Sequence, residues 1–380
     1  MRTVADETYD VFISYSRADG RHATEIDSVQ RKQVRNRNFA LVVVGFLFTL
    51  AVLLYANGIG GAQDYVKARE LLEKAAAKDG EYAMTALGLL YQNGQGGPQD
   101  YVKARELLEE AADKGDANAM TNLGLLYQNG QGVPQDYVKA REWYEKAADK
   151  GNAFAMTNLG LLYQNGRGVP QDYGKAREWY EKAADKGNAF AMNNLGLLYE
   201  NGQGVPQDYV KAREWYEKAA DKGDANAKAN LETLPIREAV AAGRYVEALH
   251  LQDALAAKVE AVETKREGKP GKETAQALTS VAWHALFARE YTKALTVSDR
   301  AHALLPDNLL IETNRAHALM FLERSEDAQA LYLAHKGKPM TEQDSQLWER
   351  AIAADFAEFR KVGLTHPMMV DIEKELGVSR

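Results

Sequence analysis

A 36-residue unit that recurs in register is the feature that most constrains this chain. Five copies, the last one truncated, start at Asp64, Asp100, Asp136, Asp172 and Asp208. Self-similarity at this period is typical of a solenoid, in which each unit buries its apolar side only against its neighbours. The repeats therefore predict an all-α fold, an α/α solenoid of helix-turn-helix units.

Each unit resolves into two short amphipathic helices. In the third unit the Asp136 carboxylate is placed to cap the first helix, and Gly151 to end it in the left-handed conformation. Asn152 can cap the second helix, which the Asn165-Gly166 pair ends. Helices of about three turns are marginal on their own, so stacking on neighbouring units has to stabilise them.

A glycine recurs inside the second helix of the unit, at Gly88, Gly124, Gly160 and Gly196. Glycine costs a helix roughly 1 kcal/mol relative to alanine, so its recurrence predicts a neighbouring helix that passes too close for a methyl group. On the Ala-rich stripe of the first helix, the later units carry a Trp-Tyr pair where the first two carry Leu-Leu. We interpret Trp143, Trp179 and Trp215 as core residues rather than as a carbohydrate-stacking ladder.

The recurring pattern is KAxxWYxKAAxxGxxxA followed by LGxLYxxGxGVxxD, and it covers residues 64–231. It resembles the Sel-one-like repeat (SLR), a relative of the tetratricopeptide repeat (TPR). The resemblance implies an α/α superhelix that binds proteins or peptides along its inner face. Such proteins often serve as adaptors in bacterial signalling, envelope assembly or host contact.

From Pro235 the 36-residue rhythm stops and a 34-residue spacing follows, in which Ala282 and Ala294 are matched by Ala316 and Ala328. That spacing resembles TPR units. The polar stretch 265–272 is expected to be an inserted loop. The tail is expected to form two helices that cap the solenoid end, with four candidate capping residues: Trp348, Phe356, Phe359 and Met368.

Residues 39–56 are apolar throughout, and their eighteen positions would span roughly 27 Å as a helix, close to the thickness of a bilayer core. A transmembrane helix is the interpretation we favour. A buried core helix and a signal peptide cleaved near Gly60 and Ala62 remain alternatives. Four basic residues precede the segment, and they predict a cytoplasmic N-terminus: Arg31, Lys32, Arg35 and Arg37.

Residues 9–19, YDVFISYSRAD, resemble the first strand and following loop of a TIR (Toll/interleukin receptor) domain. Only nineteen residues separate Asp19 from the apolar segment, too few to complete the parallel sheet of that family. We interpret the segment as a truncated remnant and assign it no catalytic residue. The alternative function is that of a TIR-related NAD-cleaving or signalling protein whose TIR domain is truncated.

The composition argues against several classes of function. The formal net charge is -7, whereas nucleic-acid binders normally present a basic surface. The absence of cysteine excludes disulfides and thiolate metal sites, and the histidines show no spacing typical of a metal site. Oppositely charged residues at i,i+4, such as Arg141 with Glu145 and Glu142 with Lys146, predict solvated helix faces. We predict no enzyme activity, cofactor or metal.

Polar residues that repeat in phase without a packing reason are the candidates for partner binding. A tyrosine starts each first helix, and an asparagine precedes the Leu-Gly pair of the second. Side-chain amides one repeat apart could bond a peptide backbone along a groove, or they could bond adjacent loops and stabilise the stack. The candidates are Tyr101, Tyr137, Tyr173, Tyr209, Asn122, Asn158 and Asn194.

The sequence thus predicts a membrane-anchored scaffold, single-pass in the bacterial inner membrane, with its repeats in the periplasm. Its partners would be proteins or peptides; the oligomeric state is left open. The expected segments are the cytoplasmic residues 1–38, the transmembrane helix 39–56, the SLR array 57–235, the TPR-like repeats 236–340 and the capping helices 341–380.

Overall fold

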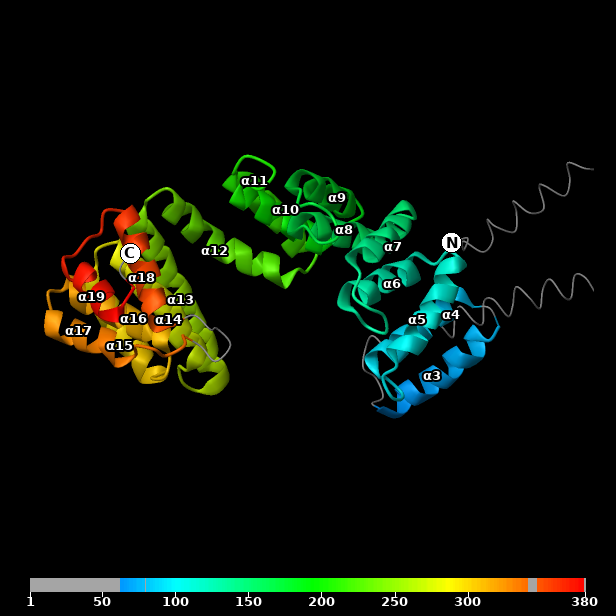
Figure 1. Cartoon of the computed structure of the whole chain (residues 1–380), viewed down its shortest axis with the longest axis horizontal. Coiled ribbons are helices and arrows are strands. Elements are labelled where there is room, and N and C mark those ends of the chain that lie inside the picture. Colours follow the sequence, from blue (N-terminus) through cyan, green and yellow to red (C-terminus); the bar gives the residue numbers. More distant parts are fainter. Residues whose placement is uncertain (1–61, 79, 341–346, 379–380) are drawn as a thin grey trace, which may run out of the picture. The chain divides into compact units, whose positions relative to one another are not determined.

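The computed structural model describes residues 62–78, 80–340 and 347–378. These residues form α-helices, numbered α3 to α19, and no strand longer than an isolated bridge (Figure 1). The predicted all-α repeat fold is therefore confirmed for the described residues. They fall into two compact units, one ending at Asn188 and the other beginning at Ala189.

The first unit consists of paired helices that follow the repeat. From α5 to α9 each helix starts directly after a capping Asp or Asn, and α4 to α9 each have 13 residues. The helices are α3 (Ala62–Ala76), α4 (Glu81–Asn93), α5 (Tyr101–Asp113), α6 (Ala117–Asn129), α7 (Tyr137–Asp149), α8 (Ala153–Asn165) and α9 (Tyr173–Asp185).

The predicted caps are confirmed in the third repeat. The Asp136 carboxylate accepts the backbone N–H groups of Val138 and Lys139, both at 3.0 Å, at the start of α7. The Asn152 side chain accepts the N–H of Ala155 at 3.0 Å at the start of α8. Gly166 follows α8 at a φ of 64°, so its lack of a side chain allows the left-handed end.

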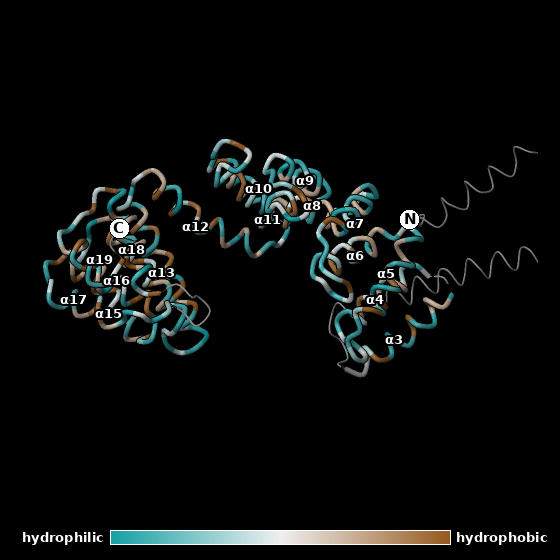
Figure 2. Tube along the Cα trace, in the orientation of Figure 1, coloured by the Kyte–Doolittle hydropathy of each residue, from teal (hydrophilic) through white to brown (hydrophobic). Residues whose placement is uncertain are grey.

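The second unit begins with the last SLR helices and continues into longer ones. Its helices are α10 (Ala189–Asn201), α11 (Tyr209–Asp221), α12 (Ala225–Ala241), α13 (Tyr245–Glu267), α14 (Lys272–Phe287), α15 (Tyr291–Leu304), α16 (Leu309–Phe321), α17 (Ser325–Ala334), α18 (Trp348–Lys361) and α19 (Met368–Leu376). Along the trace of both units hydrophobic and hydrophilic residues alternate within single helices, as in amphipathic helices (Figure 2).

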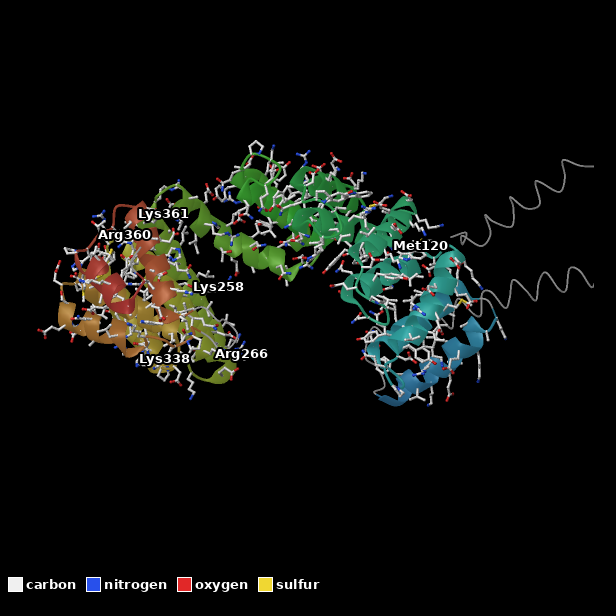
Figure 3. The ribbon with its side chains drawn as sticks, viewed as in Figure 1. Met120, Lys258, Arg266, Lys338, Arg360 and Lys361 are labelled. Carbon is white, nitrogen blue, oxygen red and sulfur yellow. The ribbon has the colours of Figure 1, made fainter. Side chains whose placement is uncertain are left out.

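Two expectations at the junctions of the second unit need correction. The predicted loop 265–272 is shorter than expected and spans only residues 268–271, because α13 continues to Glu267 and α14 starts at Lys272. Arg266 therefore lies on the last turn of α13 (Figure 3). Pro235, where the 36-residue rhythm stops, lies inside α12, so the boundary expected between residues 235 and 236 falls within one helix.

The C-terminal helices enclose an aromatic core. Three of the four residues proposed to cap the solenoid end, Trp348, Phe356 and Phe359, are fully buried in this core. The fourth, Met368, is partly buried and packs against the same core, and its neighbour Met369 is buried. The 34-residue spacing has a packing basis, since all four of its alanines are fully buried: Ala282, Ala294, Ala316 and Ala328.

The TIR-like residues 9–19 and the apolar segment 39–56 lie outside the described residues. Among the helices that are described, none is both long enough and apolar enough to cross a membrane.

Candidate partner-binding face

A close contact between a glycine and a tyrosine ring recurs in three helix pairs of the array, at Gly124, Gly160 and Gly196. A Cβ atom added to Gly160 in α8 would lie 2.4 Å from Cε1 of Tyr180 in α9, far inside van der Waals contact. The Tyr180 hydroxyl donates to Oε1 of Gln164 at 2.6 Å, and burial raises the pKa of this tyrosine. The glycine is therefore required because a tyrosine ring occupies the space of a methyl group, as the sequence predicted.

The earliest described step of the array uses a smaller residue in the same place. Gly88 in α4 faces Leu108 in α5, and an added Cβ would lie 3.0 Å from Cγ of that leucine. Both Leu108 and its counterpart Leu72 are buried. These two leucines thus pack at the position of the later tyrosines, Leu108 with a looser fit against its glycine, whereas Leu71, at the position of the later tryptophans, is exposed.

The tryptophans are less buried than expected. Trp143 and Trp179 are only partly buried, whereas the tyrosine that follows each is completely buried. Lys146 Nζ lies 4.0 Å from the centroid of the Trp143 ring, a cation–π contact. The prediction that Trp143, Trp179 and Trp215 are core residues was thus wrong in part: their rings lie at the edge of the packed layer. Lys146 thus contacts the Trp143 ring instead of Glu142, the partner predicted from the i,i+4 spacing.

One side of the second helices remains accessible in the first unit. On each of these helices the exposed and half-buried residues include positions i, i+4, i+7 and i+11, which line up along one side of a helix. We call these twelve residues the second-helix stripe: Tyr82, Ala86, Leu89 and Asn93 on α4, Asn118, Asn122, Leu125 and Asn129 on α6, and Phe154, Asn158, Leu161 and Asn165 on α8.

Charge is divided unevenly between the two kinds of helix. The second helices α6 and α8 contain no charged residue, and α4 contains one, Glu81. The first helices α5, α7 and α9 each contain six. The second-helix stripe is therefore neutral, and apart from Glu81 every charged residue within α4 to α9 lies on a first helix.

Successive second helices are linked by polar side chains that sequence reasoning missed. Thr85 in α4 donates to the Asp116 carboxylate, which caps α6, at 2.7 Å. The Asn152 amide, which caps α8, donates to Oδ1 of Asn118 in α6 at 2.9 Å. A signal was present in the sequence, because Asp116 and Asn152 occupy the same position of the repeat. Because helix capping already explained both residues, their second role, the link to the preceding second helix, was not predicted.

The three predicted asparagines have different surroundings. The Asn122 amide donates to the carbonyl of Asn118 in its own helix at 2.9 Å, and Asn158 is half-buried on the second-helix stripe. Asn194, on α10 of the second unit, is buried, and its Nδ2 has no hydrogen-bond partner among the described residues. Their role in partner binding stays a prediction.

The predicted tyrosines lie at the turns between repeats. The Gln135 amide donates both to the Tyr137 hydroxyl at 3.1 Å and to the carbonyl of Gln128 at 2.8 Å. A Cβ on Gly168 would lie 2.7 Å from the backbone carbon of Tyr137. The glutamine bridge recurs in every described repeat that carries the pair, at Tyr101, Tyr137, Tyr173 and Tyr209. These tyrosines order the turns, and partner contact by them is untested.

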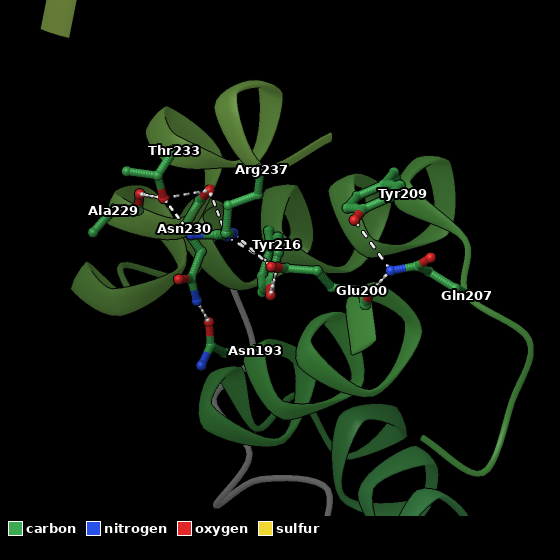
Figure 4. Close-up of polar contacts among 9 residues, drawn as sticks. All are labelled: Asn193, Glu200, Gln207, Tyr209, Tyr216, Ala229, Asn230, Thr233 and Arg237. Carbon is green, nitrogen blue, oxygen red and sulfur yellow. Dashed lines mark hydrogen bonds and ion pairs between the residues drawn. The ribbon is translucent and has the colours of Figure 1, made fainter. Parts of the chain in front are cut away.

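The second unit replaces the recurring glutamine with a carboxylate. Glu200 in α10 stands where Gln128 and Gln164 stand in the earlier repeats, and it is 7% exposed. The Tyr216 hydroxyl of α11 donates to it at 2.7 Å, and Arg237 Nη2 of α12 donates to it at 2.9 Å (Figure 4). Burial and this hydrogen bond raise the pKa of Tyr216. The arginine balances the buried charge.

A second polar link joins α10 to α12 in the same region. The Asn230 amide donates to Oδ1 of Asn193 at 2.9 Å, and Arg237 Nη1 donates to the Thr233 hydroxyl at 2.6 Å (Figure 4). Together with the Glu200 contacts, these bonds hold the last SLR helix pair to α12. No group of three or more His, Asp or Glu side chains in the described part of the chain is placed to hold a metal ion.

Comparison with known proteins agrees with this geometry. The Sel1 repeat model matches five successive segments: residues 47–80, 81–116, 117–152, 153–188 and 189–224. No curated protein sequence matches the chain significantly. Each of the four matched segments that begin at residue 81 or later contains the second helix of one unit and the first helix of the next.

Solved structures give the fold. A protective antigen present in uropathogenic Escherichia coli strains, which displays an SLR fold, is 23% identical over 94% of this chain and 81% of its own, with a TM-score of 0.50. A Sel1 repeat protein from Oxalobacter formigenes is 28% identical over 62% of this chain and 86% of its own, with a TM-score of 0.46. The first of these similarities supports the SLR fold and nothing beyond it.

Proposed function

We propose that this Sel1-repeat chain is a membrane-anchored scaffold that binds protein or peptide partners through its repeats. The observation that carries the proposal is the second-helix stripe, whose residues recur in phase on α4, α6 and α8 and stay accessible. A surface that repeats at fixed intervals can hold an extended chain at several points along its length.

The proposed anchor is the apolar segment 39–56. It contains eighteen residues without a charge, and the basic residues before it favour a cytoplasmic N-terminus. The repeats would then lie on the outer side of the bacterial inner membrane. A role in signalling or in envelope assembly is the finer proposal, and it depends on this location.

Site-specific photo-crosslinking in cells that produce the full chain tests the scaffold. A photoreactive phenylalanine at Asn122 or Asn158 should crosslink a discrete protein, because both residues lie on the accessible stripe. The matched control places the same residue at Val138 on the first helix α7, which is exposed but outside the stripe. Equal crosslinking from both helices would contradict a role for the second-helix stripe.

The anchor is tested by a different experiment. Alkaline phosphatase fused to the C-terminus of the full chain should be active only if the repeats are exported. A fluorescent protein that does not fluoresce after export, fused at the same position, is the complementary reporter. Fluorescence of this fusion together with an inactive phosphatase fusion would contradict the proposed topology. Turnover of NAD by the purified full chain would favour the TIR-related alternative over the scaffold.

A further inference from the structure

We propose that the partner segment held by the second-helix stripe is an uncharged, extended peptide with apolar side chains. This inference rests on the proposed function, because it names the chemistry of the partner at that same face. It is carried by three features of the first unit: the neutral stripe, its half-buried leucines and its exposed aromatic residues.

The first feature is the absence of charge where charge is usual. The solvent side of a helix in a soluble protein is normally polar and charged, and the centres of protein interfaces are depleted of charged residues. The stripe on α6 and α8 has no charged residue, although α5, α7 and α9 have six each. The stripe thus has the composition of an interface centre rather than of a solvated surface.

The second feature is the pairing of amides with leucines. On α6, Asn122 and Leu125 lie one turn apart, and Asn158 and Leu161 repeat this arrangement on α8. A carboxamide can both donate to and accept from a peptide backbone, and a leucine offers apolar surface to the neighbouring side chain. An extended chain presents these two kinds of group in alternation.

The third feature is aromatic. Phe154 is 68% exposed at the first position of the stripe on α8, and Tyr82 is 57% exposed at the same position on α4. Large exposed aromatic residues are typical of the anchor points of an interface. Both occupy the same position of the repeat, and the residues on either side of Phe154 are alanines.

The electrostatics select against a charged partner. A Lys or Asp side chain bound over the stripe would lose water without gaining an opposite charge, because α6 and α8 supply none. The charged first helices of a second copy would meet the same penalty. A second copy could still pair stripe to stripe, and the experiment separates that case.

A displayed library of random 12-residue peptides, panned on the full chain in detergent, tests the proposal. Peptides that bind the stripe should be depleted of charged residues relative to the library. For the tightest peptide, measured by fluorescence polarisation, a Lys or Asp placed at its centre should weaken binding at least tenfold. Selected peptides that are as charged as the library would overturn the inference.

Variants of the chain give the reciprocal test. Asn122→Asp with Asn158→Asp adds two charges with almost no change of shape, and should weaken the neutral peptide at least tenfold while circular dichroism shows retained helices. The same variant should bind the Lys-substituted peptide more tightly than the wild type does. Glu142→Gln on the outer side of α7 is the matched control and should leave both affinities unchanged.

The outcomes distinguish the inference from the proposed function. Peptides that bind through the stripe but tolerate charge would overturn the inference and leave the scaffold standing. Failure of every selected peptide to respond to the two Asn→Asp changes would contradict partner binding by this face. A dimer in light scattering that the same variant abolishes would assign the stripe to a second copy and overturn the peptide occupant.

Discussion

The Sel1 array and the C-terminal helices are both all-α, but different contacts stabilise them. In the array, similar contacts recur from step to step: a glycine lies against a tyrosine ring or a leucine, and the tyrosine hydroxyl, where present, donates to a glutamine or to Glu200. In the C-terminal helices, Phe359 packs within 5.5 Å of three phenylalanine or tryptophan rings in a single cluster, measured between centroids.

Buried polar groups show the same difference. In the C-terminal core, His317 is fully buried, with Nδ1 2.7 Å from the Tyr332 hydroxyl and Nε2 3.0 Å from the Asp355 carboxylate. The Trp348 indole donates to the carbonyl of Tyr332 at 2.7 Å. This network occurs once, whereas the Tyr–Gln bond of the array is present in two successive steps, Tyr144 with Gln128 and Tyr180 with Gln164, and Tyr216 bonds Glu200 in the next step. The stabilising contacts of the array are thus spread over successive units, whereas those of the C-terminal helices lie together in one core.

The largest loss of stability is expected for a substitution in the aromatic core of the C-terminal helices. Phe359→Ala removes a fully buried ring and should reduce the free energy of unfolding by about 3 to 5 kcal/mol. Chemical denaturation followed by tryptophan fluorescence measures the loss. Phe359→Leu is the matched control and should lose less, because it leaves a smaller cavity. A loss below about 1 kcal/mol for the alanine variant would contradict a concentrated core.

The next largest loss of stability is expected for a glycine that packs against a tyrosine ring in the array. Gly160→Ala should destabilise the α8–α9 pair by about 1 to 3 kcal/mol, because the added methyl overlaps the Tyr180 ring. Hydrogen exchange of α8 and α9 would report it locally. Gly88→Ala is the control, since its gain in helix propensity of about 1 kcal/mol offsets the tight contact with Leu108. The double variant Gly160→Ala, Tyr180→Leu should recover stability. Equal losses for Gly160→Ala and Gly88→Ala would contradict the Tyr180 ring as the cause.

A third effect depends on pH. The Glu263 carboxylate of α13 accepts the Thr274 hydroxyl at 2.6 Å and three backbone N–H groups at the start of α14, which lowers the pKa of Glu263 to about 2. Its contribution is fully present above the unfolded value near 4.5, and is lost as the pH falls from there towards 2.

The measurement is the melting temperature of the full chain between pH 6 and pH 2. Glu263→Gln should flatten this dependence, whereas Glu267→Gln, on an exposed residue four positions along the same helix, should leave it as in the wild type. An unchanged acid slope in Glu263→Gln would show that the carboxylate does not stabilise the α13–α14 connection.

The smallest effect is at the edge of the array. Lys146→Ala removes the ammonium over the Trp143 ring and should cost about 0.5 to 1 kcal/mol, as expected of a partly exposed cation–π pair. Urea denaturation of the full chain, with Lys150→Ala as the control at an exposed position, would detect it. A loss as large as that of Gly160→Ala would mean that the tryptophan belongs to the core after all.

Much of the array could be predicted because local chemistry decides it. Asp136 and Asn152 cap helices through their own side chains, and Gly166 ends α8 through its own backbone. The glycine inside α8 also predicted a close neighbour. The identity of that neighbour, Tyr180, lies twenty residues away and follows from the packing geometry rather than from any local signal.

The misses have physical causes as well. Lys265 to Lys272 read as a loop because charge, Gly and Pro dominate, but the buried carboxylate of Glu263 binds the start of α14 and allows helix almost to the tip. The division of charge between helices was visible in the sequence. Its significance required knowing which side of α6 and α8 stays accessible, and only the structure shows that.

The pairing of Glu200 with Arg237 limits how such an array can grow. Solenoids lengthen by duplication of whole units, and the repeats that carry Gln128 or Gln164 can be copied without introducing a buried charge. The repeats carry asparagine 36, 72 and 108 residues before Arg237, at Asn201, Asn165 and Asn129. A duplicated copy of the unit that contains Glu200 would therefore bury a carboxylate without an arginine partner. New units are thus accommodated before the Glu200 unit and not after it.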